Sequence, residues 1–344
     1  MHVQSSISAH MMEGVARRIA LRLGLLWLLV LSAFVAALCL GARDYGPGLL
    51  WQILRGYDVS NPAQAIMVEM RLPRALAAVV VGAALAVAGL MMQSLARNPL
   101  ADPGLTGVNA GAALAVVAGL WLTGPLTAGG TAALALTGAG VAALVVRALA
   151  GQGDSTLRLP LAGAAFASLC MAVVAFVVLL NPEARNIYRF WMVGSLAIAN
   201  GEGLIRLAPV ALVGIGIAIM VARQVETLML GDELGAALGV NAGRVMSLGL
   251  AAITCCAGAA VAIAGPVGFI GLIAPHLARR VGAGTGLTAT VLLACPLGAI
   301  ITLLADTVGR RLVRPAELPL GIVLAMVGAP VFMWLVRRIL RGEA

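Results

Sequence analysis

The sequence predicts an all-α, polytopic membrane protein with about ten transmembrane helices. The chain is 61% hydrophobic and only 11% charged, whereas soluble domains carry about 25% charged residues. Its mean hydropathy is +1.03, and its charged residues cluster so that long uncharged runs separate them. Such runs are typical of transmembrane helices, which need about 20 apolar residues to cross about 30 Å of hydrocarbon.

The uncharged runs divide into ten spans within a single transmembrane domain, 1–344. A cytoplasmic tail of about residues 1–18 is expected first, followed by an uncleaved helix, because no small-x-small cleavage pattern follows that helix. Two runs are too long for one helix, and Gly124-Pro125 with Gly129-Gly130 splits the first while Gly265-Pro266 splits the second. The expected spans are 23–41, 75–96, two within 103–146, 159–182, 207–222, two within 245–278 (the second of them short), 286–305 and 318–336.

The basic residues predict the orientation. All 23 are arginine, and an even number of spans puts both termini on one side of the membrane. With both termini cytoplasmic, thirteen arginines fall inside, a small excess of the sign that the positive-inside rule requires. The arginines stand singly or in pairs, without a basic stripe and interleaved aromatics, which argues against nucleic-acid binding. The inside set is Arg17, Arg18, Arg22, Arg97, Arg147, Arg158, Arg223, Arg244, Arg279, Arg280, Arg337, Arg338 and Arg341.

The chain lacks the usual signatures of catalysis. Without lysine it cannot contain a G-x-x-x-x-G-K-[ST] phosphate loop, and it has no H-E-x-x-H and no evident Ser/His/Asp constellation. Its five cysteines form no C-x-x-C and are interpreted as small apolar filler, so no metal site is expected. We therefore expect a chain that is not an enzyme and binds no cofactor.

An ion-coupled secondary transporter is the alternative from another class. Such carriers usually place ionisable residues in the middle of the membrane. Here Asp306 lies at a helix end, and His276 follows Pro275 in the short eighth helix. His276 is open to three interpretations: a proton relay, a metal or haem ligand, or a polar residue at a helix break. So few charges inside the spans favour an energy source on another subunit.

Six motifs stand out along the chain: RLPR at 71–74, RNPLADPG at 97–104, GPVGFIGLIAPH at 265–276, LAD at 304–306, ELP at 317–319 and GAPVF at 328–332. Together they resemble the permeases of type II binding-protein-dependent ABC importers, which take up iron siderophores, haem and cobalamin. Within that family the likeness is greatest to ferric-enterobactin permeases, at 108–111, 189–191, 194–196 and 336–342, whereas 286–303 departs from them.

The resemblance implies a type II ABC importer permease fold in a bacterial inner membrane. It implies a pore between two permease subunits, either identical chains or paralogues. Two ATPase subunits, which hold ATP and magnesium, are implied beneath the pore, and a periplasmic substrate-binding protein above it. The implied activity is translocation of an iron–siderophore complex into the cytoplasm, with the catecholate type favoured. Transport of haem or cobalamin is the alternative.

The resemblance also implies roles for two cytoplasmic segments. Asn98 and Leu100 are expected to form a gate, with Thr156 in a second gate segment; plain turns are the alternative. Residues 230–243 are expected to form two short helices joined by glycine that dock in a cleft of the ATPase, and a solvated amphipathic loop is the alternative. The coupling residues expected there are Asp232, Glu233, Leu238, Gly239 and Val240.

Two further sets of residues are expected outside. Arg71 and Arg310 match positions at which related permeases present arginine to the binding protein, and the planar guanidinium suits a carboxylate partner. Anchoring to lipid headgroups is the alternative for both. Arg189, Phe190 and Trp191 follow the fifth span and are candidate contacts for an anionic, aromatic substrate. An aromatic belt at the membrane interface explains the two aromatic residues equally well.

Overall fold

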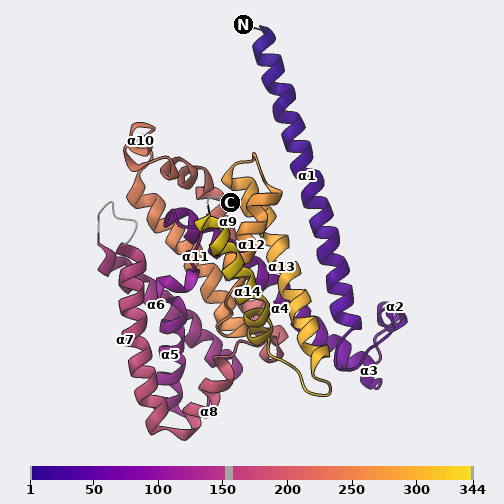
Figure 1. Ribbon diagram of the computed structural model, residues 1–344. Helices are drawn as coiled ribbons and strands as arrows, with labels where there is room; N and C mark the ends of the chain where they lie inside the picture. The colour runs from indigo at the N-terminus through magenta and orange to yellow at the C-terminus, as the bar shows by residue number, and fades with distance from the viewer. Residues whose placement is uncertain (1, 152–157, 342–344) are drawn as a thin grey trace.

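The computed structural model describes residues 2–151 and 158–341, which form a helical bundle with no strand among them (Figure 1). A π-helix, η1 (Ile66–Arg71), runs directly from α3 into α4, and two short 3-10 helices occur elsewhere, η2 (Pro103–Thr106) and η3 (Leu196–Ile198). The helices are α1 (His2–Cys39), α2 (Pro47–Arg55), α3 (Pro62–Ala65), α4 (Leu72–Leu95), α5 (Val108–Thr123), α6 (Ala128–Ala150), α7 (Arg158–Leu180), α8 (Pro182–Trp191), α9 (Gly201–Met229), α10 (Asp232–Ala237), α11 (Ala242–Ala264), α12 (Ile270–Val281), α13 (Leu287–Leu312) and α14 (Leu320–Leu340).

The expected set of about ten spanning helices is confirmed. Among the described residues, eight helical segments are long and apolar enough to cross a membrane. The shorter helices α5 and α12, of 16 and 12 residues, occupy the places of the expected third and eighth spans. The glycine and proline breaks fall where the sequence predicts them. Thr127 caps α6 three residues after Gly124 ends α5, and Gly265 ends α11 with φ 73°, a backbone conformation that favours glycine.

One local expectation is wrong, that of two short helices in 230–243. Residues 2–18, the expected cytoplasmic tail, are the first part of α1, whose 38 residues extend for about 57 Å at 1.5 Å per residue. That is roughly twice the thickness of the hydrocarbon layer, so α1 continues well beyond its apolar stretch. Residues 230–243 contain one short helix, α10, and not two; a turn with Gly239 at φ 79° leads from it toward α11.

Helix α4 forms the centre of the bundle and α1 lies at its edge. In its most apolar window 83% of the α4 residues are buried, against 6% for α1. Glycines let the α4 backbone approach its neighbours closely. A Cβ added at Gly82 would lie 2.3 Å from the carbonyl oxygen of Gly298 in α13, and one at Gly89 would lie 2.0 Å from that of Gly271 in α12. Close backbone approach is how helices associate in lipid, where no hydrophobic force separates helix from acyl chain.

The bundle has two ends that matter for function. One carries α10, and we call it the α10 end. The opposite end carries α2, α3 and α8, and we call it the α8 end (Figure 1). The first residues of α1 and the last described residues of α14 point toward the α10 end (Figure 1). Both termini thus lie on the same side of the bundle, as an even number of spans requires.

Candidate transport site

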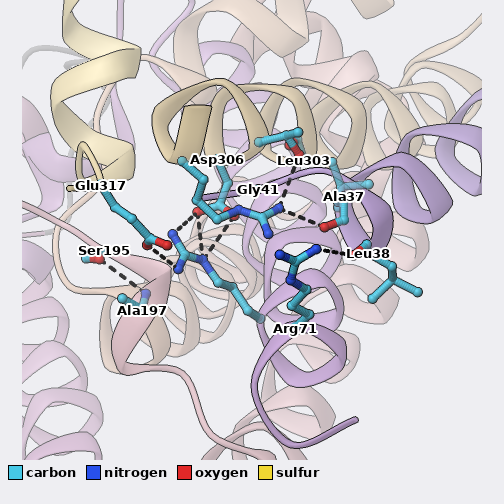
Figure 2. A network of polar contacts seen from close by, with 12 residues as sticks. Ala37, Leu38, Gly41, Arg71, Ser195, Ala197, Leu303, Asp306 and Glu317 are labelled. Carbon is cyan, nitrogen blue, oxygen red and sulfur yellow. Dashed lines mark hydrogen bonds and ion pairs between the residues drawn. The ribbon is translucent and has the colours of Figure 1, made fainter. Parts of the chain in front are cut away.

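A buried cluster of arginines and carboxylates lies at the α8 end (Figure 2). Arg74 donates from Nε to both Asp306 carboxylate oxygens at 3.1 Å and from Nη2 to Oδ1 at 2.9 Å, while its Nη1 donates to Glu317 at 2.7 Å. Arg310 lies one helical turn after Asp306, and its Nε is 3.1 Å from Asp306 Oδ2. The Asp306 carboxylate thus lies between two guanidinium groups, and Glu317 supplies the second negative charge that balances them. The cluster ties the start of α4 to α13 and to the segment that precedes α14.

Two arginines cap the end of α1. The last carbonyl groups of a helix have no partner within the helix. Arg71 Nη1 donates to Leu38 O at 2.6 Å and to Cys39 O at 3.2 Å, and Arg310 Nη2 donates to Ala37 O at 2.9 Å (Figure 2). Positive charge is also favourable beside the negative end of a helix dipole. These contacts anchor the weakly buried helix α1 to the bundle.

The structure corrects the expected exposure of Arg71 and Arg310. Arg71 is only 8% exposed and Arg310 only 4%, because both side chains turn inward to the end of α1 and, for Arg310, to Asp306. Exposed arginines at this end include Arg311 and Arg314, which contact Asp44 at 3.3 and 2.9 Å. The hydrogen bond from Arg314, with that from the Gly41 N–H, lowers the pKa of the Asp44 carboxyl. Asp44 therefore stays ionised throughout the neutral pH range.

The short helix α8 places the three expected substrate contacts in different surroundings. Arg189 and Phe190 are exposed, with the guanidinium 5.5 Å from the phenyl centroid, whereas Trp191 is buried. Asn181 caps the start of α8, and its side chain accepts from the Glu183 and Ala184 N–H groups. Phe190 and Trp191 help to line a largely apolar cavity of about 320 Å³ between α6, α8, α9 and α11.

The gate residues lie in the loop that follows α4, at the α10 end. Asn98 Oδ1 accepts from the Leu100 N–H at 2.9 Å, which fixes the turn at Pro99. Asn98 is exposed and Leu100 is half-buried. Thr156, the third expected gate residue, lies outside the described residues.

The coupling residues lie on and after α10, close to the gate loop. Asp232 and Glu233 lie in its first turn, where acidic side chains interact favourably with the positive end of the helix dipole. Leu238 follows α10 and is 65% exposed, while Val240 is half-buried and donates its N–H to Gly235 O at 2.9 Å. Arg97, for which the sequence predicts no coupling role, donates to the Asp232 carboxylate.

Helix α12 carries His276 and is tied to α4 by a buried amide. Gln93, 2% exposed, donates to Gly271 O at 3.1 Å and accepts from Arg279 at 2.6 Å. His276 is half-buried, and its Nε2 has no hydrogen-bond partner among the described residues. No group of three metal-ligating side chains occurs in the part of the chain that the structure describes.

Comparison with known proteins gives matches along nearly the whole chain. Residues 28–338 match the FecCD transport family. The ferric enterobactin transport system permease protein FepD of Escherichia coli is 43% identical over 336 residues, which cover 96% of this chain and 98% of that protein. The hemin transport system permease protein HmuU of Yersinia pestis is 39% identical and covers 93% and 97% of the two chains. The solved inward-facing structure of a putative metal-chelate type ABC transporter superposes with a TM-score of 0.81 at 28% identity, covering 93% and 99%.

Proposed function

This chain belongs to the FecCD transport family and is a permease of the importers for iron siderophores, haem or ferric citrate, and we propose that its own substrate is an iron–siderophore complex of the catecholate type. The observation that carries this proposal is the 43% identity to the ferric enterobactin permease over nearly both full lengths. The exposed Arg189 and Phe190 support it, because a cation beside an aromatic ring suits an anionic, aromatic ligand. A haem substrate is the second candidate, since the hemin permease is 39% identical.

The proposed energy source is a separate ATPase chain that docks at the α10 end. The exposed Leu238 and the acidic first turn of α10 form a small protruding surface that suits a cleft on a partner. On this proposal Asp232, Glu233, Leu238, Gly239 and Val240 form the coupling surface. Asn98 and Leu100 form a gate beside it, and Thr156 belongs to a second gate segment. The α10 end then faces the cytoplasm of a bacterial cell, and both termini are cytoplasmic.

A second permease subunit would complete the pore. Helices α7 and α14 offer apolar surface for such a partner, because only 22% and 24% of their most apolar windows are buried within the single chain. Exposed side chains on these helices include Phe176 and Leu179 on α7 and Met326 and Met333 on α14. We propose that an identical chain or a paralogue covers part of this surface and that lipid covers the rest.

The α8 end is the proposed docking face for a periplasmic binding protein. Arg71 and Arg310 are too buried to reach a partner directly in this arrangement. We propose that they act by holding α1 and the cluster in place, and that Arg311 and Arg314 present the exposed positive charge. Charge complementarity at the rim of an interface acts mainly on the association rate.

The test is uptake by the complete complex in liposomes. The permease pair, its ATPase and its binding protein are reconstituted, and import of a ferric catecholate, haemin and cobalamin is compared. Import of the ferric catecholate alone, dependent on ATP, is the expected result. Preferential import of haemin or cobalamin would replace the proposed substrate. Import that continues with an inactivated ATPase and follows an imposed proton gradient would instead favour a secondary transporter.

A further inference from the structure

The end of α4 contains an arginine in a position that normally suits glycine. Arg97 donates its N–H to Ser94 O at 3.3 Å, and Asn98 donates its N–H to Gln93 O at 3.0 Å. This pair of bonds is the Schellman ending of a helix, in which the residue after the cap adopts the left-handed conformation and is usually glycine. Arg97 has φ 48°. A side chain at this position costs conformational free energy that glycine would avoid. Backbone conformation therefore does not explain why arginine is present here.

The Arg97 side chain joins three helix ends. Its Nη2 donates to Leu228 O at 2.6 Å, in the last turn of α9, and to the Asp232 carboxylate in the first turn of α10. Arg97 itself directly follows α4. The positive charge lies near the negative ends of α4 and α9, and the negative charge lies at the positive end of α10. The contact therefore connects the gate loop, 98–100, to α10, which follows it by more than 130 positions in the sequence.

Helix α10 is otherwise lightly attached. Gly231 at φ 126° precedes it and Gly239 at φ 79° follows it, so both flanking connections have backbone conformations that glycine adopts freely. Leu234 within α10 is 52% exposed. Among the described residues, the Arg97–Asp232 contact is the side-chain ion pair that reaches α10. A short helix between two glycines, held by one ion pair, can rotate about those glycines. Its movement then displaces the segment that the ion pair contacts.

We propose that Arg97 is a positioning residue of the transport cycle, which transmits a displacement of α10 to the gate loop through its ion pair with Asp232. This inference rests on the proposed function. A purely stabilising role explains the contact less well. The two side chains are 32% and 33% exposed, and ion pairs in contact with water contribute little to stability. Such a pair contributes too little stability to offset a strained backbone conformation. Non-glycine residues in strained conformations concentrate at functional sites.

The experiment compares Arg97→Gly, Asp232→Asn and the double variant in the reconstituted complex. Glycine suits the left-handed conformation, so Arg97→Gly is expected to fold and assemble with the ATPase at least as well as the native chain. Uptake per ATP hydrolysed is expected to fall about five-fold or more, the lower end of typical coupling factors. The double variant should be no worse than either single one, because both changes break the same pair. Arg22→Ala is the control, since Arg22 donates to the Val281 carbonyl at the same end without contacting α10.

A second readout needs no substrate. ATP is added to the permease–ATPase complex, and amide hydrogen exchange is followed in α10 and in the gate loop. Both segments should respond in the native chain and in Arg22→Ala, whereas only α10 should respond in Arg97→Gly. A gate loop that still responds in Arg97→Gly, or uptake per ATP equal to that of the native chain, would overturn the inference. A native complex that imports no ferric chelate would contradict the proposed substrate, and the exchange measurement would still decide the role of Arg97.

Discussion

Removing the Asp306 carboxylate tests whether the buried cluster holds the α8 end together. In Asp306→Ala the guanidinium groups of Arg74 and Arg310, 12% and 4% exposed, lose the carboxylate between them. Breaking a buried ion pair costs about 3 to 5 kcal/mol, because the remaining charge is left without a partner. Glu317 still neutralises Arg74 from 2.7 Å, so the expected loss lies near the lower end, about 3 kcal/mol.

The assay is unfolding of the purified chain by titration with sodium dodecyl sulfate, followed by tryptophan fluorescence. Glu317→Ala is the matched control, because it removes a carboxylate that also contacts Arg74 but is 35% exposed, and it should cost about 1 kcal/mol or less. Asp306→Asn should fall between the two, since the amide keeps one acceptor oxygen and loses the charge. Equal midpoints for Asp306→Ala and Glu317→Ala would refute the reasoning.

Three further outcomes are expected. Leu238→Glu should leave the fold intact, since Leu238 is 65% exposed, but should abolish the stimulation of ATPase activity by loaded binding protein; full stimulation with normal assembly would place the coupling surface elsewhere. Gly82→Val should cost about 1 to 3 kcal/mol or more in the same unfolding assay because its Cβ would meet Gly298 O at 2.3 Å, whereas Gly216→Val, with nothing within 4 Å, should cost less. Arg310→Glu should lower the unfolding midpoint as well as binding-protein affinity; weaker binding at an unchanged midpoint would show that Arg310 acts on the partner directly.

The sequence predicts the spanning helices well because lipid imposes a simple rule on them. Every backbone group inside the membrane must be paired within the protein, so breaks can occur only where glycine or proline permits them. The pairs at 124–125 and 265–266 are such places. They separate α5 from α6 and α11 from α12. Helices α5 and α12, although short, were predicted from these breaks and not from hydropathy alone.

The sequence predicts less well where polar contacts join distant segments. The carbonyl groups that end α1 are paired by Arg71, 33 positions after Leu38, and by Arg310, 273 positions after Ala37. No local pattern distinguishes an arginine that caps a distant helix from one that faces water. One signal was available, because Asp306 and Arg310 are four positions apart and lie on the same face if the expected helix 286–305 continues through them, as α13 does. That spacing predicts an ion pair, although it does not predict burial.

A family resemblance predicts a role for a residue without showing which groups its side chain contacts. Arg71 and Arg310 were assigned to docking by motif position, yet each places its guanidinium on the end of α1. A substitution at either position would disturb α1 and, through it, the surface formed by Arg311, Arg314 and Asp44. Weakened docking would then follow from either a direct or an indirect role, so affinity alone cannot separate them. The stability of the isolated chain can separate them. An arginine that only contacts a partner contributes nothing to that stability, whereas one that caps α1 does.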